Sequence, residues 1–143
     1  MSNRENKEMD KKELIRFALE ARKMSYAPYS GYRVGAALLT KDGKVYQGCN
    51  IENAAYTPTN CAERTAFFKA VSAGEREFAA IAVVGGKDEQ PRDYSWPCGV
   101  CRQVMMEFCN PKTFRVITAI SEEEYSDKTL EEMLPHGFGP KSL

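Results

Sequence analysis

The sequence has little of several features that mark other kinds of protein. Its 143 residues contain one histidine and one tryptophan, and no Lys/Arg cluster is longer than a pair. No apolar run is long enough to span a bilayer. Basic and acidic residues balance at twenty each, whereas a protein that grips a nucleic-acid backbone normally carries a basic face. The composition therefore argues against a membrane protein and against a polynucleotide-binding protein, and it favours a small neutral ligand.

The amino terminus also lacks the apolar stretch of a signal peptide. Residues 1–12 are polar and charged, and residues 1–9 are typical of a flexible tail. The five cysteines are an odd number, which in a reducing compartment indicates thiols or metal ligands rather than a disulfide framework. We therefore expect a cytoplasmic protein that folds as one domain over residues 1–143.

Helical and strand-like patterns alternate along the chain. Asp10 and Glu13 predict a capping box at the start of a helix that must end before Pro28. Strands are predicted at residues 32–39 and 44–49, as a hairpin, and at 79–85 and 113–120. Further helices are predicted from an N-cap at Asn60, from Pro97 as a first helical residue, and from Thr129. This order predicts an α/β fold, a three-layer α/β/α arrangement around a mixed, roughly five-stranded sheet.

Two cysteine clusters carry the strongest chemical signal. Cys61 precedes Ala62-Glu63, and Cys98 and Cys101 lie in the segment Pro97-Cys98-Gly99-Val100-Cys101. Three protein ligands are what a catalytic zinc site takes, leaving a fourth position for water. Both clusters fall at predicted helix starts, where the helix dipole favours thiolates, and Cys98 and Cys101 share one face of a helical turn.

A fourth ligand would make such a site merely structural. Cys109 would lie about 12 Å along the helix from Cys101, too far to share an ion. Cys49 points away from the face of its strand that carries Asn50 and Glu52, and His136 is expected to be solvated or to serve packing. The sequence therefore favours an open, catalytic zinc.

Five charged or polar residues near the clusters have competing interpretations. By itself, Glu63 would be interpreted as a capping residue at the third helical position, but beside metal ligands a proton-transfer role is favoured. Arg64 is expected to offset thiolate charge, whereas for Arg102 the same role and a plain surface position both stay open. Asn50 and Glu52 share one face of an extended segment and could hold sugar hydroxyls, the alternative being a solvated strand end.

From about Leu14 onward the sequence resembles the cytidine deaminases of the short, free-nucleoside class. Glutamate two residues after the first cysteine and the Pro-Cys-x-x-Cys segment resemble the signature of zinc deaminases. The resemblance extends over further segments, namely Tyr26-Ala27-Pro28-Tyr29-Ser30, Val34-Gly35-Ala36-Ala37-Leu38, Asn50-Ile51-Glu52-Asn53-Ala54, Cys61-Ala62-Glu63-Arg64-Thr65, Arg102-Gln103 and Leu134-Pro135.

The resemblance implies a role for each matching residue. Cys61, Cys98 and Cys101 would bind one zinc per subunit, Glu63 would shuttle protons, and Arg64 would temper the thiolate charge. Substrate contacts would come from Asn50 and Glu52 on the ribose 3′-hydroxyl, the Ala62 amide on the pyrimidine carbonyl, Tyr32, and Phe138 stacking on the base from another subunit. The family forms homotetramers with shared active sites. It usually has phenylalanine at Tyr32, and serine or threonine at Trp96, where the backbone carbonyl is expected to accept from the substrate amino group.

The activity that the resemblance implies is hydrolytic deamination of cytidine and 2′-deoxycytidine to uridine and 2′-deoxyuridine, in pyrimidine salvage. Two alternatives remain. One is a deaminase of a larger cytosine nucleoside such as blasticidin S, which the Asn50–Ala54 stretch and the Phe138 tail argue against. The other is a zinc-stabilised binding module without activity, which would need a fourth protein ligand.

Overall fold

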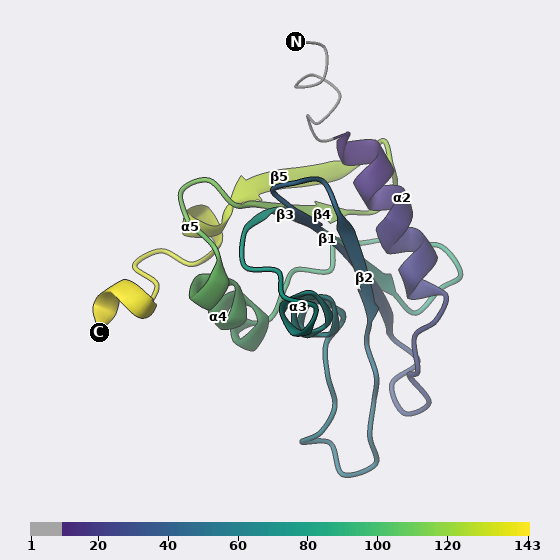
Figure 1. Ribbon diagram of the computed structural model, residues 1–143. Helices are drawn as coiled ribbons and strands as arrows, with labels where there is room; N and C mark the ends of the chain where they lie inside the picture. Colours follow the sequence, from purple (N-terminus) through teal and green to yellow (C-terminus); the bar gives the residue numbers. More distant parts are fainter. Residues whose placement is uncertain (1–9) are drawn as a thin grey trace.

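A mixed five-stranded sheet forms the centre of the protein (Figure 1). The structure, a computed structural model, describes residues 10–143, so the predicted tail at residues 1–9 lies outside the described residues. The strands lie in the order β2-β1-β3-β4-β5, with β3 and β4 parallel and the other neighbours antiparallel. Their bounds are β1 Arg33–Thr40, β2 Val45–Cys49, β3 Phe78–Gly86, β4 Arg115–Ala119 and β5 Tyr125–Thr129.

Helices cover both faces of this sheet, as Figure 1 shows. Helix α2 packs on one face, and α3, α4 and α5 lie on the other. The bounds are α2 Lys11–Arg22, α3 Ala62–Ser72, α4 Gly99–Phe108 and α5 Leu130–Met133, followed by a 3-10 turn at Pro140–Ser142. The three-layer α/β/α prediction is confirmed.

Side chains of the central strands alternate between two cores. In β1, Ala36 and Leu38 face α3, whereas Ala37 and Leu39 face α2, as the two-residue period of a strand requires. The larger core is built around Phe67 of α3, whose ring centroid lies 5.2 Å from that of Phe78 and 6.1 Å from that of Phe114. Such aromatic pairs stabilise a core beyond the area they bury. Helix α3 is therefore fixed firmly to the sheet.

Two predicted helix starts were wrong by one or two residues. The N-cap of α3 is Cys61, not Asn60, because the backbone of Asn60 pairs in a β-bridge with Ile51. The N-cap of α4 is Cys98, so Pro97 lies before the helix rather than at its first position. Both shifts place a cysteine directly at the point where a helix begins.

Other local signals were correct at least in part. Asp10 is the N-cap of α2 and accepts from the amides of Lys12 and Glu13, but Glu13 does not return the second bond of the predicted capping box. Thr129 is the N-cap of α5, where Glu132 completes a capping box. The short edge strand β5 is absent from the segment predictions, because its sequence Tyr-Ser-Asp-Lys-Thr has neither an apolar run nor a clear alternation. Within residues 10–143, no helix combines the length and the apolar character needed to cross a membrane.

Candidate functional site

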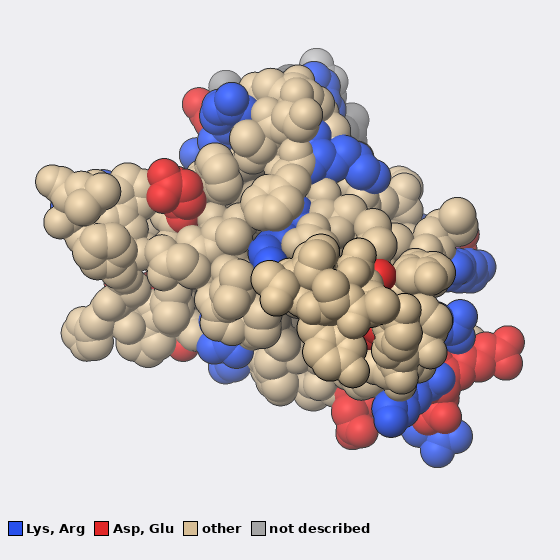
Figure 2. All heavy atoms as spheres, turned by 90° about the horizontal axis from the view of Figure 1, so that it is seen from below, with Lys and Arg blue, Asp and Glu red and all other residues tan. Residues whose placement is uncertain are grey.

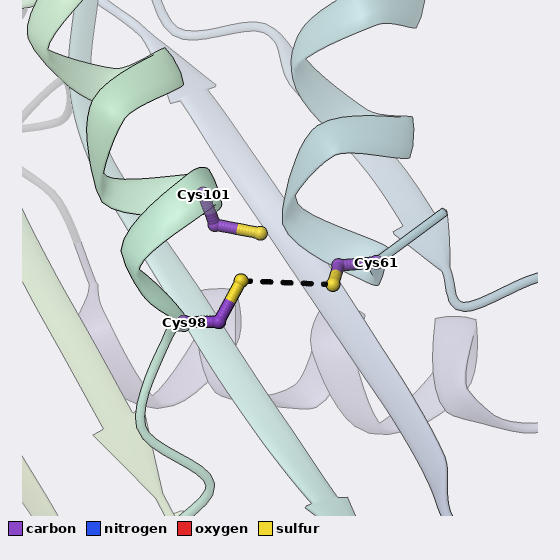
Figure 3. Close-up of side chains that lie close together, drawn as sticks. All are labelled: Cys61, Cys98 and Cys101. Carbon is purple, nitrogen blue, oxygen red and sulfur yellow. Dashed lines mark hydrogen bonds between the residues drawn. The ribbon is translucent and has the colours of Figure 1, made fainter. Parts of the chain in front are cut away.

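The N-termini of α3 and α4 converge at one edge of the sheet. Strands β2 and β3 both run antiparallel to β1, so they point the same way, and α3 follows β2 while α4 follows β3. Neither N-cap side chain, Cys61 or Cys98, accepts a capping hydrogen bond from the backbone amides of its helix. Both sulfurs point instead toward each other and toward Cys101 in the first turn of α4 (Figure 3).

The three sulfurs have the spacing of a thiolate metal site. They lie within 4.8 Å of one another, and the Cys61 and Cys98 sulfurs are 3.9 Å apart. Zinc–sulfur bonds of about 2.3 Å in a tetrahedron separate sulfurs by roughly 3.8 Å. Within residues 10–143, no fourth cysteine, histidine or acidic ligand atom joins this group. We call Cys61, Cys98, Cys101 and the adjacent Glu63 the metal centre.

The surroundings of the sulfurs favour the thiolate form. The side chain of Arg64 donates to the Cys61 sulfur at 3.2 Å. Hydrogen bonding from Cys101 and from Arg64 lowers the pKa of the Cys61 thiol to about 5. The pKa of the Cys101 thiol is raised, because this thiol is the donor to Cys61 and because it is buried. These hydrogen bonds favour the thiolate form of Cys61, and binding of a divalent cation would displace the protons of the other two thiols.

Glu63 lies in the first turn of α3 with its side chain in the interior. It is 5 % exposed, and burial raises the pKa of its carboxyl to about 7. The capping interpretation does not apply, because the Asn60 amide donates to the carbonyl oxygen of Ile51 at 2.9 Å. The carboxyl therefore remains available beside the sulfurs.

The close packing of α3 on β2 fixes the position of this first turn. A Cβ atom at Gly48 would lie 2.5 Å from the Ala62 carbonyl oxygen and 2.5 Å from the Ala66 amide nitrogen. Only glycine permits this approach of helix backbone to strand backbone. The absence of a side chain at Gly48 therefore lets the first turn of α3, which carries Ala62 and Glu63, lie directly against β2.

Asn50 and Glu52, the predicted sugar-holding pair, have different surroundings. Asn50 is buried, accepts from the amide of Val34 at 2.9 Å and donates to the carbonyl oxygen of Tyr32 at 2.8 Å. One amide hydrogen and one lone pair of this side chain remain for a ligand. Asn50 thus also fixes the backbone on both sides of Arg33, where β1 begins.

Glu52 is held by the loop before β1. Its carboxylate accepts from the amides of Tyr29, at 2.9 Å, and Ser30, at 3.2 Å, and from the Ser30 hydroxyl. The Ser30 hydroxyl and these amides lower the pKa of the Glu52 carboxyl. Glu52 lies in a cavity of about 390 Å³, which we call the loop pocket, lined by Tyr29, Ser30, Glu52, Asn53, Tyr56 and Thr59.

Arg102, whose role the sequence left open, binds backbone carbonyl groups, whereas Arg64 binds a cysteine sulfur. Its guanidinium donates to the carbonyl oxygen of Pro97 at 2.7 Å and to that of Met133 at 2.6 Å. It thereby joins the segment before Cys98 to the end of α5. The sequence did not predict this role of Arg102, nor the hydrogen bonds from Ser30 to the Glu52 carboxylate, since neither residue type nor spacing indicates the distant partner.

The remaining candidate residues lie at the surface. Phe138 is 60 % exposed, and its carbonyl oxygen accepts from the Gln103 side chain. Trp96 is 45 % exposed, with its ring centroid 5.4 Å from that of Tyr94. His136 is exposed and has a φ of 56°. The side chains of Trp96, just before Cys98, and of Phe138, near the carboxyl terminus, are thus both exposed to solvent.

Three converging cysteine sulfurs beside a buried glutamate, at the edge of a three-layer mixed sheet, match the metal site of the zinc-dependent deaminases. Comparisons with known proteins agree. The sequence profile "Cytidine and deoxycytidylate deaminase zinc-binding region" matches residues 8–118. The chain therefore belongs to the cytidine and deoxycytidylate deaminase family, and zinc is its cofactor.

Individual relatives match over nearly their whole length. A cytidine deaminase of Sporosarcina psychrophila is 50 % identical over 135 residues, covering 94 % of this chain and 96 % of the relative. One from Halalkalibacterium halodurans is 50 % identical over 136 residues, covering 94 % and 98 %. The crystal structure of cytidine deaminase from Burkholderia pseudomallei superposes with a TM-score of 0.83 at 48 % identity, covering 91 % of this chain and all of that one.

Proposed function

We propose that this protein catalyses the hydrolytic deamination of cytidine and 2′-deoxycytidine to uridine and 2′-deoxyuridine, with release of ammonia, in pyrimidine salvage. The observation that carries the proposal is the convergence of Cys61, Cys98 and Cys101 on one point beside the buried Glu63. The similarity to proteins named cytidine deaminase at 50 % identity supports the same substrate class.

In this proposal Cys61, Cys98 and Cys101 hold the zinc ion. Zinc bound to three thiolates supplies a Lewis acid that makes water a nucleophile near neutral pH. Arg64 supports this chemistry, because its hydrogen bond to the Cys61 sulfur offsets part of the negative charge of the ligands.

Glu63 moves the protons of the reaction. Water adds to C4 of the cytosine ring, and the Glu63 carboxylate takes one proton from it and passes that proton to N3. The C4–N4 bond then breaks, with Glu63 returning a second water-derived proton to the leaving amine, so that ammonia departs and the C4 carbonyl of uridine remains. The backbone amide of Ala62, in the first turn of α3, would donate to the pyrimidine carbonyl and orient the ring.

The other predicted residues are assigned to the sugar and to the amino group of the substrate. Asn50 and the ionised Glu52 would hold the ribose 3′-hydroxyl, and Tyr32, adjacent to the backbone that Asn50 fixes, would flank the nucleoside. The carbonyl oxygen of Trp96 would accept from the substrate amino group. The three hydrogen bonds to Glu52 support this assignment, because they leave it ionised and fixed in place.

We further propose a cytoplasmic homotetramer of single-domain subunits that share active sites. Viewed from the side of the loop between β2 and α3, the surface in Figure 2 is broad and largely uncharged, with charged side chains gathered mainly at its rim. Several large apolar side chains are exposed, including Ile51, Tyr56, Phe68 and Phe138. An exposed aromatic such as Phe138 could stack on a base bound in a neighbouring subunit.

The proposal is tested by zinc and turnover measurements on the purified protein. We expect about one zinc per chain and loss of absorbance as cytidine or deoxycytidine is converted. Blasticidin S is the comparison substrate, and faster turnover of it than of cytidine would overturn the substrate assignment. One zinc per chain without turnover of any of the three would instead indicate a binding module.

The assembly has its own test. Sedimentation should give a tetramer, and Phe138→Ala should raise KM for cytidine with unchanged zinc content. A monomer with the parent's full activity would contradict the shared site.

A further inference from the structure

Arg22, the last residue of α2, is a buried cation that forms no close ion pair, although the charge of the nearby Asp88 acts favourably on it. It is 5 % exposed, and within residues 10–143 its guanidinium forms no ion pair. Burying a charge costs free energy unless hydrogen bonds compensate for the lost water. A buried arginine in a protein of this size therefore calls for a specific structural reason.

Backbone carbonyl groups accept all the hydrogen bonds that the guanidinium donates. Nε donates to the carbonyl oxygen of Arg33 at 3.0 Å, and one terminal nitrogen donates to that of Glu89 at 2.8 Å. The other donates to Gly86 at 2.8 Å and also to Asp88. A planar guanidinium presents five donors in a fixed fork, so one side chain fixes the start of β1 and the loop after β3 relative to each other.

The backbone of Arg22 is itself held against the sheet. A Cβ atom at Gly35 would lie 2.4 Å from the Arg22 amide nitrogen and 2.1 Å from the carbonyl oxygen of Ala18. The end of α2 therefore rests directly on β1. Because the backbone of Arg22 is fixed against β1, its guanidinium can hold the segments that it contacts in place.

Both of these segments continue into the proposed active site. Arg33 lies between Tyr32 and Val34, the two residues whose backbone groups bind the Asn50 side chain. The loop that begins at Gly86 runs to Cys98. Before it arrives there, Ser95 lies over Gly85, where an added Cβ would meet the Ser95 hydroxyl oxygen at 2.7 Å.

We propose that Arg22 is a positioning residue for nucleoside binding, acting through the Tyr32–Val34 backbone and the loop of residues 86–96 rather than by contact with substrate. This inference rests on the proposed function. Loss of the guanidinium releases the start of β1 and the loop together, so the groups that hold the nucleoside lose their mutual alignment while the three sulfurs, carried by α3 and α4, keep theirs.

Arg22→Ala tests the role through the split between KM and kcat. We expect KM for cytidine to rise about tenfold, kcat to fall less than about threefold, and zinc content to stay at the parent's value. Arg22→Lys, which keeps the charge but not the fork, should give an intermediate KM. Arg76→Ala is the matched control, because Arg76 also donates to carbonyl groups, those of Val71 and Glu75, but is exposed and lies in the connection between α3 and β3.

Chemical rescue separates positioning from general stability. A cavity of about 610 Å³ beside the guanidinium is lined by Arg22, Lys23, Arg33, Glu89 and Gln90, so a small cation can enter from solvent. Millimolar guanidinium chloride, far below denaturing concentrations, should lower the KM of Arg22→Ala toward the parent value, whereas equal sodium chloride should not. The parent and Arg76→Ala should be unaffected by either salt.

The outcomes distinguish this inference from the proposed function. A parent without cytidine turnover would remove the proposed function itself. An active parent, together with Arg22→Ala or Arg22→Lys that keeps the parent's KM and only melts at a lower temperature, would overturn the positioning role. If Arg22→Ala does not fold, the KM of Arg22→Lys decides alone, and a value equal to the parent's contradicts the inference.

Discussion

The metal centre and the loop pocket each contain one glutamate, and the two are held in opposite ways. Glu63 lies in the interior at the start of α3, on a helix packed tightly against the sheet, and its carboxylate interacts with the amide of its own residue. Glu52 lies in an irregular segment, and three donors from Tyr29 and Ser30 surround its carboxylate.

This difference is consistent with the separate roles that we propose for the two glutamates. A carboxylate tied by three donors stays ionised and stationary, which suits an acceptor for a sugar hydroxyl. A carboxylate on a rigid helix beside metal ligands, with its oxygens uncommitted to a cap, suits the exchange of protons with a substrate. Changes in the metal centre should therefore affect kcat and zinc content, and changes in the loop pocket should affect KM.

The largest expected effect comes from removing a metal ligand. Cys101→Ser replaces a buried sulfur of the cluster, so zinc content should fall well below one per chain and deamination should fall by at least about a hundredfold. Cys49→Ser is the control, because Cys49 lies outside the cluster and burial raises the pKa of its thiol, keeping it neutral. Full zinc and activity in Cys101→Ser would remove Cys101 from the metal centre.

A smaller effect is expected where the metal centre rests on the sheet. Gly48→Ala places a Cβ 2.5 Å from the α3 backbone, so the first turn of α3 must move. A shift of this kind should lower kcat by about 10- to 100-fold and also lower the melting temperature. Gly99→Ala is the matched control, since a Cβ there meets nothing within 4 Å although Gly99 adjoins Cys98. Equal kcat values in the two variants would contradict this role of Gly48.

The smallest effect is expected in the loop pocket. Ser30→Ala removes one donor to Glu52 and should raise KM for cytidine about threefold to tenfold with unchanged kcat. Because the Ser30 hydroxyl lowers the pKa of the Glu52 carboxyl, its removal raises that pKa. On acidification, KM should therefore begin to climb at a higher pH in Ser30→Ala than in the parent.

This pH dependence is measured as KM between neutral and mildly acidic pH, with zinc content determined at each point. Ser72→Ala, at the exposed end of α3, is the control and should follow the parent. Superimposable profiles for Ser30→Ala and the parent would show that the hydroxyl does not act on Glu52.

The sequence predicted the parts of the site that depend on local spacing. Cys98 and Cys101 are one turn apart, and glutamate follows Cys61 by two residues, so the cluster could be proposed from short segments. The contact of Ser30 with Glu52 spans 22 residues, and that of Arg22 with Glu89 spans 67. Such contacts depend on how strands and loops come together, which residue types alone do not specify.

Fold prediction succeeded for elements with a local sequence pattern and failed where the structure depends on pairing between distant segments. Apolar runs and capping residues located four strands and four helices, because burial and end-capping leave local patterns. Asn60 was wrong as an N-cap because a backbone pairing with Ile51 overrode its capping preference. The fifth strand was missed as a segment because an edge strand with little burial needs no apolar pattern.

One paired measurement tests the separate roles proposed for Glu63 and Glu52 most directly. Glu63→Gln and Glu52→Gln are compared with the parent in kcat, KM for cytidine and zinc per chain. We predict that Glu63→Gln keeps zinc and loses at least about a hundredfold in kcat, whereas Glu52→Gln keeps most of kcat and raises KM. A Glu63→Gln variant with zinc and the parent's kcat, or a Glu52→Gln variant that loses kcat at unchanged KM, would contradict the account.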